Sequence, residues 1–141
     1  MSDVQFRWLD QFEVGIAELD ADHREMCRQI NLICDFALAR DHDAAERQLA
    51  LLIELAASHF EREEVLKHGI GGDTTTPLES CIGPRDAVLA DLATRLRAEG
   101  SAFDLSGLSP VLIDWFCKQT IGHDAWIRAY FHQTGPTLVP R

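Results

Sequence analysis

Apolar residues recur at every third or fourth position along most of this chain, which is the period of an amphipathic helix. The alternation of apolar and polar residues that marks a half-buried strand is nearly absent. Glycine, proline and serine interrupt the helical pattern at a few places and divide it into four segments. The helices predicted in this way cover residues 19–40, 43–68, 84–100 and 109–133.

Capping residues mark several of these boundaries. Either Asp20 or Asp22 can serve as the N-cap of the first helix. Pro84 and Pro110 suit the first turn of a helix, because a fixed φ is already helical and no N–H is needed there. The glycine- and threonine-rich stretch 69–83 between the second and third helices is predicted to be a loop.

Four amphipathic helices with short connections predict an all-α fold, an antiparallel up-down four-helix bundle. About the first 18 residues form an N-terminal arm that packs across it. A chain of 141 residues can bury a core without disulfides, and we expect a single domain over residues 1–134. Residues 135–141 form a tail, and its last four residues, 138–141, read LVPR, the part of a thrombin site left when a tag is removed.

The formal net charge of −10 argues against nucleic acid or an anionic membrane as a partner, since both require a basic surface. The N-terminal residues lack the basic and apolar regions of a signal peptide. No apolar run approaches the roughly 20 residues that a membrane-spanning helix needs. We therefore expect a cytoplasmic protein, or one domain of a larger chain.

The chain has four cysteines and no C-x-x-C pair. In a reducing compartment such residues mostly behave as small buried hydrophobic side chains. This interpretation applies to Cys27, Cys34 and Cys117, and it leaves Cys81 unassigned.

The segment SHFEREEVLKHG, residues 58–69, places His59 and Glu63 four residues apart on one helical face. Bundle cores commonly hold iron or manganese between histidines and carboxylates of facing helices. The same spacing is also common on a solvated helix face, where such side chains stabilise the helix. Spacing by itself therefore leaves a metal site and a polar surface as alternatives.

Three motifs in order resemble the bacterial hemerythrins. WLDQFEVGIAELDADH, residues 8–23, is similar to the opening of that family, with its Trp, Val-Gly-Ile and Asp-x-x-His. HFEREE, residues 59–64, resembles its His-Phe-x-x-Glu-Glu helix, and WFCKQTIGHD, residues 115–124, resembles its last helix. The resemblance covers nearly the whole chain, residues 8–130, and three ordered motifs are more specific than any one of them.

The resemblance implies a non-haem di-iron centre that binds dioxygen reversibly inside a four-helix bundle. In the family one iron has two histidine ligands, the other has three, and a glutamate and an aspartate bridge them. The two-histidine iron corresponds to His23 and His59, and the bridging carboxylates correspond to Glu63 and Asp124. The chain therefore has a suitable residue at each of these four positions.

The three histidines that the family uses for the second iron are missing. Their positions correspond to Cys81, Arg85 and Gln119, with His123 as an alternative ligand in place of Gln119. We therefore expect one ion, iron before manganese or zinc, held by two histidines and two carboxylates. In this hypothesis Arg85 occupies the place of the second iron, where its permanent positive charge pairs with the two carboxylates.

The alternative for Arg85 is an ordinary surface arginine that pairs with Glu79 or Asp86. Reversible dioxygen binding in the family takes one electron from each iron, so a single iron argues against ordinary oxygen carriage. The first function we consider is a protein, not an enzyme, that binds or senses iron, dioxygen or another diatomic ligand. The alternatives are a metal-free regulatory or interaction bundle and a mononuclear non-haem iron enzyme.

Overall fold

The computed structural model describes the backbone of residues 6–69 and 78–123, and the side chains of residues 6–66 and 87–122. All of the regular elements in these residues are helical, so the predicted all-α fold is confirmed. The long helices are α1 (Ala17–Leu38), α2 (His42–Gly69), α3 (Leu78–Glu99) and α4 (Leu108–Cys117). Three single 3₁₀ turns, η1 (Asp10–Phe12), η2 (Gly100–Ala102) and η3 (Leu105–Gly107), and a π-helical segment, η4 (Lys118–His123), complete the set.

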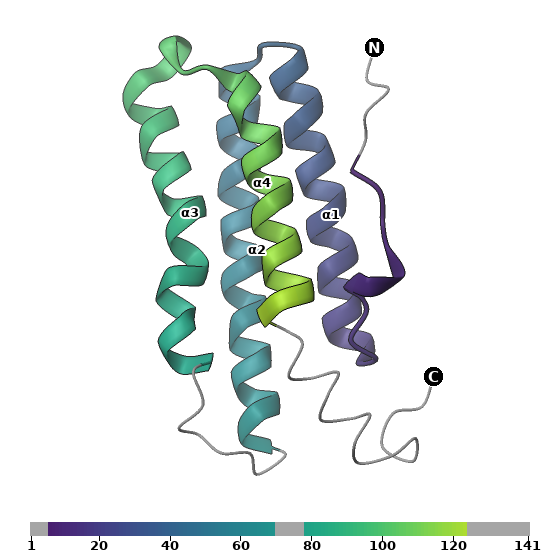
Figure 1. Cartoon of the computed structure of the whole chain (residues 1–141). Coiled ribbons are helices and arrows are strands. Elements are labelled where there is room, and N and C mark those ends of the chain that lie inside the picture. The colour runs from purple at the N-terminus through teal and green to yellow at the C-terminus, as the bar shows by residue number, and fades with distance from the viewer. Residues whose placement is uncertain (1–5, 70–77, 124–141) are drawn as a thin grey trace.

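Figure 1 shows the helices side by side with alternating direction, the predicted up-down bundle. α1 packs against α2 and α4, and α2 also packs against α3. The N-terminal arm runs along the side of α1 (Figure 1). Within residues 6–69 and 78–123, no helix combines the length and the apolar character needed to cross a membrane.

The core lies between the apolar stripes of the four helices. Its side chains recur at a spacing of three or four residues, as the sequence pattern predicts. Burying each large aliphatic side chain contributes about 1.5–3 kcal/mol, so these stripes are the main force that assembles the bundle. The central residues of the stripes are Met26, Ile30, Ile33, Leu49, Leu52, Leu89, Leu92, Leu96, Leu108, Leu112 and Phe116.

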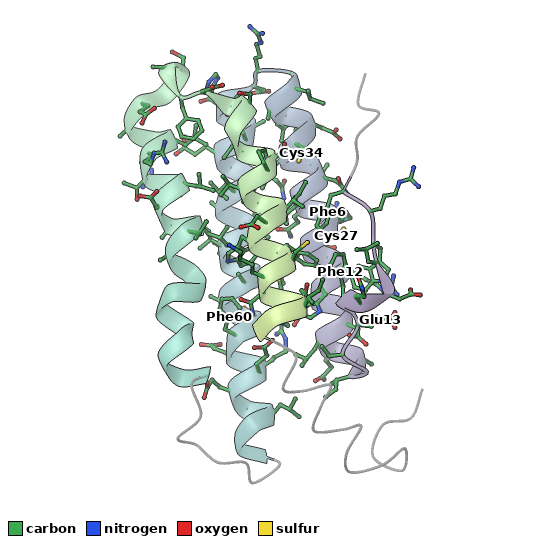
Figure 2. The ribbon with its side chains drawn as sticks, viewed as in Figure 1. Phe6, Phe12, Glu13, Cys27, Cys34 and Phe60 are labelled. Atoms are coloured by element: carbon green, nitrogen blue, oxygen red, sulfur yellow. The ribbon has the colours of Figure 1, made fainter. Side chains whose placement is uncertain are left out.

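The arm is held by aromatic packing. The ring of Phe12 is fully buried, with its centroid 4.8 Å from that of Phe116 in α4 and 5.7 Å from that of Phe6. Phe6 also meets Phe116 edge to face at 5.2 Å. Figure 2 shows Phe6 and Phe12 on the side of the bundle along which the arm passes. The arm thus supplies part of the core.

Polar contacts hold the arm in one register. Asn31 of α1 accepts a hydrogen bond from the backbone N–H of Phe6 and donates one to its carbonyl, each at 2.8 Å. Farther along the arm, Arg24 donates to Glu13 at 2.6 Å and lies 4.2 Å from the centre of the Trp8 ring. Both ends of the arm are therefore attached to α1.

We expect Asn31→Ala to loosen the arm and to lower the free energy of unfolding by about 1–3 kcal/mol, since it removes two hydrogen bonds. Arg7 is exposed beside this clamp, so trypsin should cleave after it faster in the variant. Asp35→Ala, an exposed change one turn farther along α1, is the control. Equal cleavage rates and equal urea midpoints for Asn31→Ala and the wild type would contradict this role.

The predicted N-cap of the first helix is wrong. The N-cap of α1 is Ile16, without a side-chain hydrogen bond. The carboxylate of Asp20 instead accepts from the N–H groups of Val14 and Gly15, at 2.7 and 3.3 Å. Gly15 has φ of +93°, a conformation that glycine adopts without strain. Asp20 therefore closes the turn before α1, and Asp22 has a different role at the candidate site.

The predicted start of the third helix at Pro84 is also wrong. α3 begins at Leu78, so residues 78–83 of the expected loop are helical, and residues 70–77 lie outside the described residues. The sequence of 76–79, Thr-Pro-Leu-Glu, matches the capping-box pattern, in which a threonine is followed three residues later by a glutamate. That start signal is present in the sequence, beside the glycines and threonines on which the loop prediction rested.

The last helix changes its pitch after Cys117. Residues Lys118–His123 form the π-helical segment, in which each turn holds an extra residue. The hydroxyl of Thr120 donates to the carbonyl of Phe116 at 2.9 Å, and both Gln119 and Thr120 are buried. The predicted continuation of this helix over 124–133 lies outside the described residues.

Burial of Cys27 and Cys34 agrees with the sequence interpretation, since they are 6% and 8% exposed, whereas Cys117 is partly exposed. Burial raises the pKa of all three thiols, which lowers the fraction of reactive thiolate. We expect iodoacetamide at pH 8 to modify Cys117 before Cys27 or Cys34, measured for each peptide by mass spectrometry. Modification of Cys34 as fast as that of a free thiol would contradict this order.

Candidate metal centre

Two histidines and one glutamate meet between α1 and α2. His23 comes from α1, and His59 and Glu63 come from successive turns of α2. All three side chains are fully buried. Each offers a ligand atom, and the three atoms lie within 4.8 Å of one another. Among the residues whose side chains are described, this is the group that can hold a metal ion.

The hydrogen bonds on the outer side of each ring determine where its proton lies. Nδ1 of His23 is 2.7 Å from the carbonyl oxygen of Phe12, and a carbonyl only accepts, so Nδ1 carries the proton. Nδ1 of His59 is 3.0 Å from a carboxylate oxygen of Asp22 and donates to it in the same way. In the neutral form of each ring, Nε2 is therefore left with its lone pair.

These two Nε2 atoms face each other at 3.1 Å, and a carboxylate oxygen of Glu63 lies 2.7 Å from Nε2 of His59. Three electron-pair donors at such separations require a shared proton or a cation. With metal–nitrogen bonds of about 2.1 Å, two ligands at a right angle are about 3.0 Å apart. The separation of the two histidines therefore fits neighbouring ligands of one ion.

An outer ion pair supports His59. Asp22 accepts from Nδ1 of His59, and Arg62 donates to both oxygens of the same carboxylate, from Nε at 2.7 Å and from Nη2 at 2.8 Å. Burial opposes ionisation of Asp22, but the hydrogen bonds and charges of His59 and Arg62 outweigh it and lower its pKa. Sequence reasoning considered Asp22 only as an N-cap and did not consider Arg62.

A signal for both residues was present in the spacing. Asp22 directly precedes one proposed ligand, and Arg62 directly precedes another. A metal-bound histidine usually donates its second ring N–H to a carboxylate, a carbonyl or water, so a carboxylate close to the proposed ligands is a candidate for this contact. The carbonyl of Phe12 had no sequence signal, since any residue offers one.

The remaining predicted site residues are only partly described. Gln119 is 2% exposed in η4, which packs against η1. His123 ends that segment, and Cys81 and Arg85 lie in α3, but their side chains are outside the described residues. Asp124 lies outside them entirely. The structure thus brings together three of the four proposed ligands, and the fourth stays a prediction.

Comparison with known proteins finds similarity to curated bacteriohemerythrins. The protein of that name from Pseudomonas paraeruginosa is 31% identical over 64 residues, which are 45% of this chain and 42% of the relative. Two from Pseudomonas aeruginosa strains are 30% identical over the same share of each chain. The match therefore spans less than half of the length of these relatives.

No family model matches the chain. No solved structure matches it either. The similarity to the bacteriohemerythrins is accompanied by the helix bundle and by the buried pair of histidines beside a glutamate. Together these findings support a hemerythrin-like family for the chain.

Proposed function

We propose that this chain binds one divalent metal ion, iron first, through His23, His59, Glu63 and Asp124. The observation that carries the proposal is the 3.1 Å separation of two buried Nε2 atoms, whose Nδ1 protons are already used elsewhere. The name of the chain's relatives, bacteriohemerythrin, supports iron as the ion. Two imidazoles with carboxylates suit Fe(II), Mn(II) or Zn(II).

The protein's part is to hold the ligands and to exclude water. Phe116 lies with its ring centroid 6.0 Å from that of His23, so an apolar wall adjoins the site. Glu63 supplies negative charge in a fully buried position, where a cation lowers the cost of keeping it ionised. Iron bound there would supply a coordination position for dioxygen or another diatomic ligand, which makes gas or iron sensing the function we favour.

We further propose that Arg85 of α3 takes the place of the second iron of the family. One divalent ion, one arginine and two carboxylates sum to roughly +1, close to the sum for two ions, two carboxylates and a hydroxide. The resemblance of the motifs supports this placement. Arg85→Leu should then lower the affinity for the first ion, because the second carboxylate loses its partner, whereas a surface arginine would leave that affinity unchanged.

Metal content per chain tests the function. Protein produced in iron-supplemented medium and purified without a nickel column is analysed for its elements. About one iron per chain is expected in the wild type, and none in His59→Ala. His42 lies outside the site, so His42→Gln should bind as much iron as the wild type. Two ions per chain would overturn the single-ion proposal.

No metal, even after anaerobic loading, would favour the metal-free interaction bundle. The same contacts favour that alternative if a proton lies between the rings, since His59, Glu63, Asp22 and Arg62 then form an ion network between α1 and α2. Steady oxygen consumption with a released product would instead favour the mononuclear iron enzyme.

A further inference from the structure

We propose that Asp22 and Arg62 are positioning residues of the metal site, which hold the His59 ring from outside in the orientation and proton arrangement that a metal requires. This inference rests on the proposed function. It adds two residues, neither of which touches the ion, and it assigns them unequal roles. Asp22 acts on the ring directly, and Arg62 acts on Asp22.

The geometry joins two helices at one point. Asp22 lies on α1 and is 12% exposed, whereas His59 and Arg62 lie on α2. One carboxylate oxygen accepts from both Nδ1 of His59 and Nε of Arg62, and the other accepts from Nη2 of Arg62. A planar guanidinium bound in this two-pronged way determines the plane of the carboxylate, and the carboxylate then determines the direction of the ring.

The arrangement makes the two histidines unequal. His23 donates to the neutral carbonyl of Phe12, whereas His59 donates to a carboxylate. A carboxylate partner increases the electron density that a ring can give to a metal, and loss of such a partner typically costs 10- to 100-fold in metal affinity. Arg62 neutralises part of that charge, so it limits the effect while it keeps the carboxylate in place. His59 is therefore the stronger of the two imidazole donors.

The structural alternative is a salt bridge that merely ties α1 to α2. Arg62 is 40% exposed, and ion pairs with one exposed partner contribute little to stability. A tie of that kind would change the resistance to urea and leave the properties of a bound metal unchanged. The two roles therefore differ in a readout that belongs to the metal.

Cobalt(II) is a suitable probe because it accepts the same ligands and shifts the proton resonances of bound imidazoles far from the rest of the spectrum. The wild type should bind one Co(II) and show two exchangeable imidazole N–H signals, one for each ring. In Asp22→Asn, the affinity for Co(II), measured by competition with a chelator, should fall about 10- to 100-fold. One N–H signal should move and exchange faster with water, while the other stays in place.

Arg62→Lys is the second variant and covers the case in which Asp22→Asn does not fold. It keeps the charge but loses the two-pronged contact, so the same N–H signal should move, with a smaller loss of affinity. Asp35→Asn is the matched control, because it makes the same change at an exposed position of α1. It should change neither readout.

The outcomes separate the two proposals. If the wild type takes up no Co(II), the proposed function and this inference both fail. If the wild type binds Co(II) and both variants bind it equally well with both N–H signals unmoved, the positioning role alone is overturned. A loss of urea resistance without any change in the bound metal would assign the pair to helix attachment and would also overturn it.

Discussion

Replacing Glu63 with glutamine should abolish most of the stabilisation that metal gives to the wild type. A ligand present at 100 times its dissociation constant stabilises a protein by about 2.7 kcal/mol. Loss of a buried ligand charge should weaken binding more than the roughly 100-fold that loss of an outer partner can cost, so this gain nearly disappears.

Urea unfolding with and without Fe(II) or Mn(II), under anaerobic conditions, measures this stabilisation. Glu61→Gln, an exposed change two residues earlier in α2, is the control and should behave like the wild type. The metal-free alternative predicts that added metal stabilises neither the wild type nor the variant. If Glu63 is half of a buried ion pair with a protonated His59, breaking that pair should cost about 3–5 kcal/mol with metal or without it.

Phe116→Ala should have the largest effect on folding, a loss of about 3–5 kcal/mol in the free energy of unfolding. Its ring is fully buried and contacts both phenylalanines of the arm, at 5.2 and 4.8 Å between centroids. The cavity would therefore open where the arm, α1 and α4 meet. Since domains of this kind are stable by only about 5–15 kcal/mol, the variant should be close to unfolding at physiological temperature.

The control for this effect is Phe36→Ala, which removes a phenylalanine that is only partly buried at the edge of the same core. It should cost clearly less, because a more exposed site loses less burial and can relax. Both variants are compared by urea unfolding. If Phe116→Ala were no more damaging than Phe36→Ala, the arm would not be part of the core.

The fold was largely predictable because a four-helix bundle is built from a local pattern. Apolar residues at helical spacing, such as Met26, Ile30 and Ile33, define the buried face of a helix wherever it packs. Helix ends were predicted less well. Aspartate is a common N-cap residue, but the carboxylate of Asp20 accepts a hydrogen bond from the preceding loop instead. Both hydrogen-bonding patterns are local, and residue type alone does not decide between them.

The candidate site was predictable only for residues that are common metal ligands and that also lie in a recognisable motif. His23, His59 and Glu63 were identified because the motifs resemble those of a known family, and spacing alone had left a solvated face as an alternative. Full burial of all three removes that alternative for these residues. Asp124, Arg85 and the other second-position residues remain predictions.

By itself, the sequence determined the helical class, the apolar stripes and the presence of imidazoles and carboxylates, because each of these depends on residue type and on neighbours within a few positions. The tertiary structure alone decided how α1 and α2 face each other, and this sets the distance of 3.1 Å between the Nε2 atoms of His23 and His59. It also decided the contacts of these rings with the Phe12 carbonyl and with Asp22. Such contacts join residues 11 and 37 positions apart, and their distances depend on how whole helices pack.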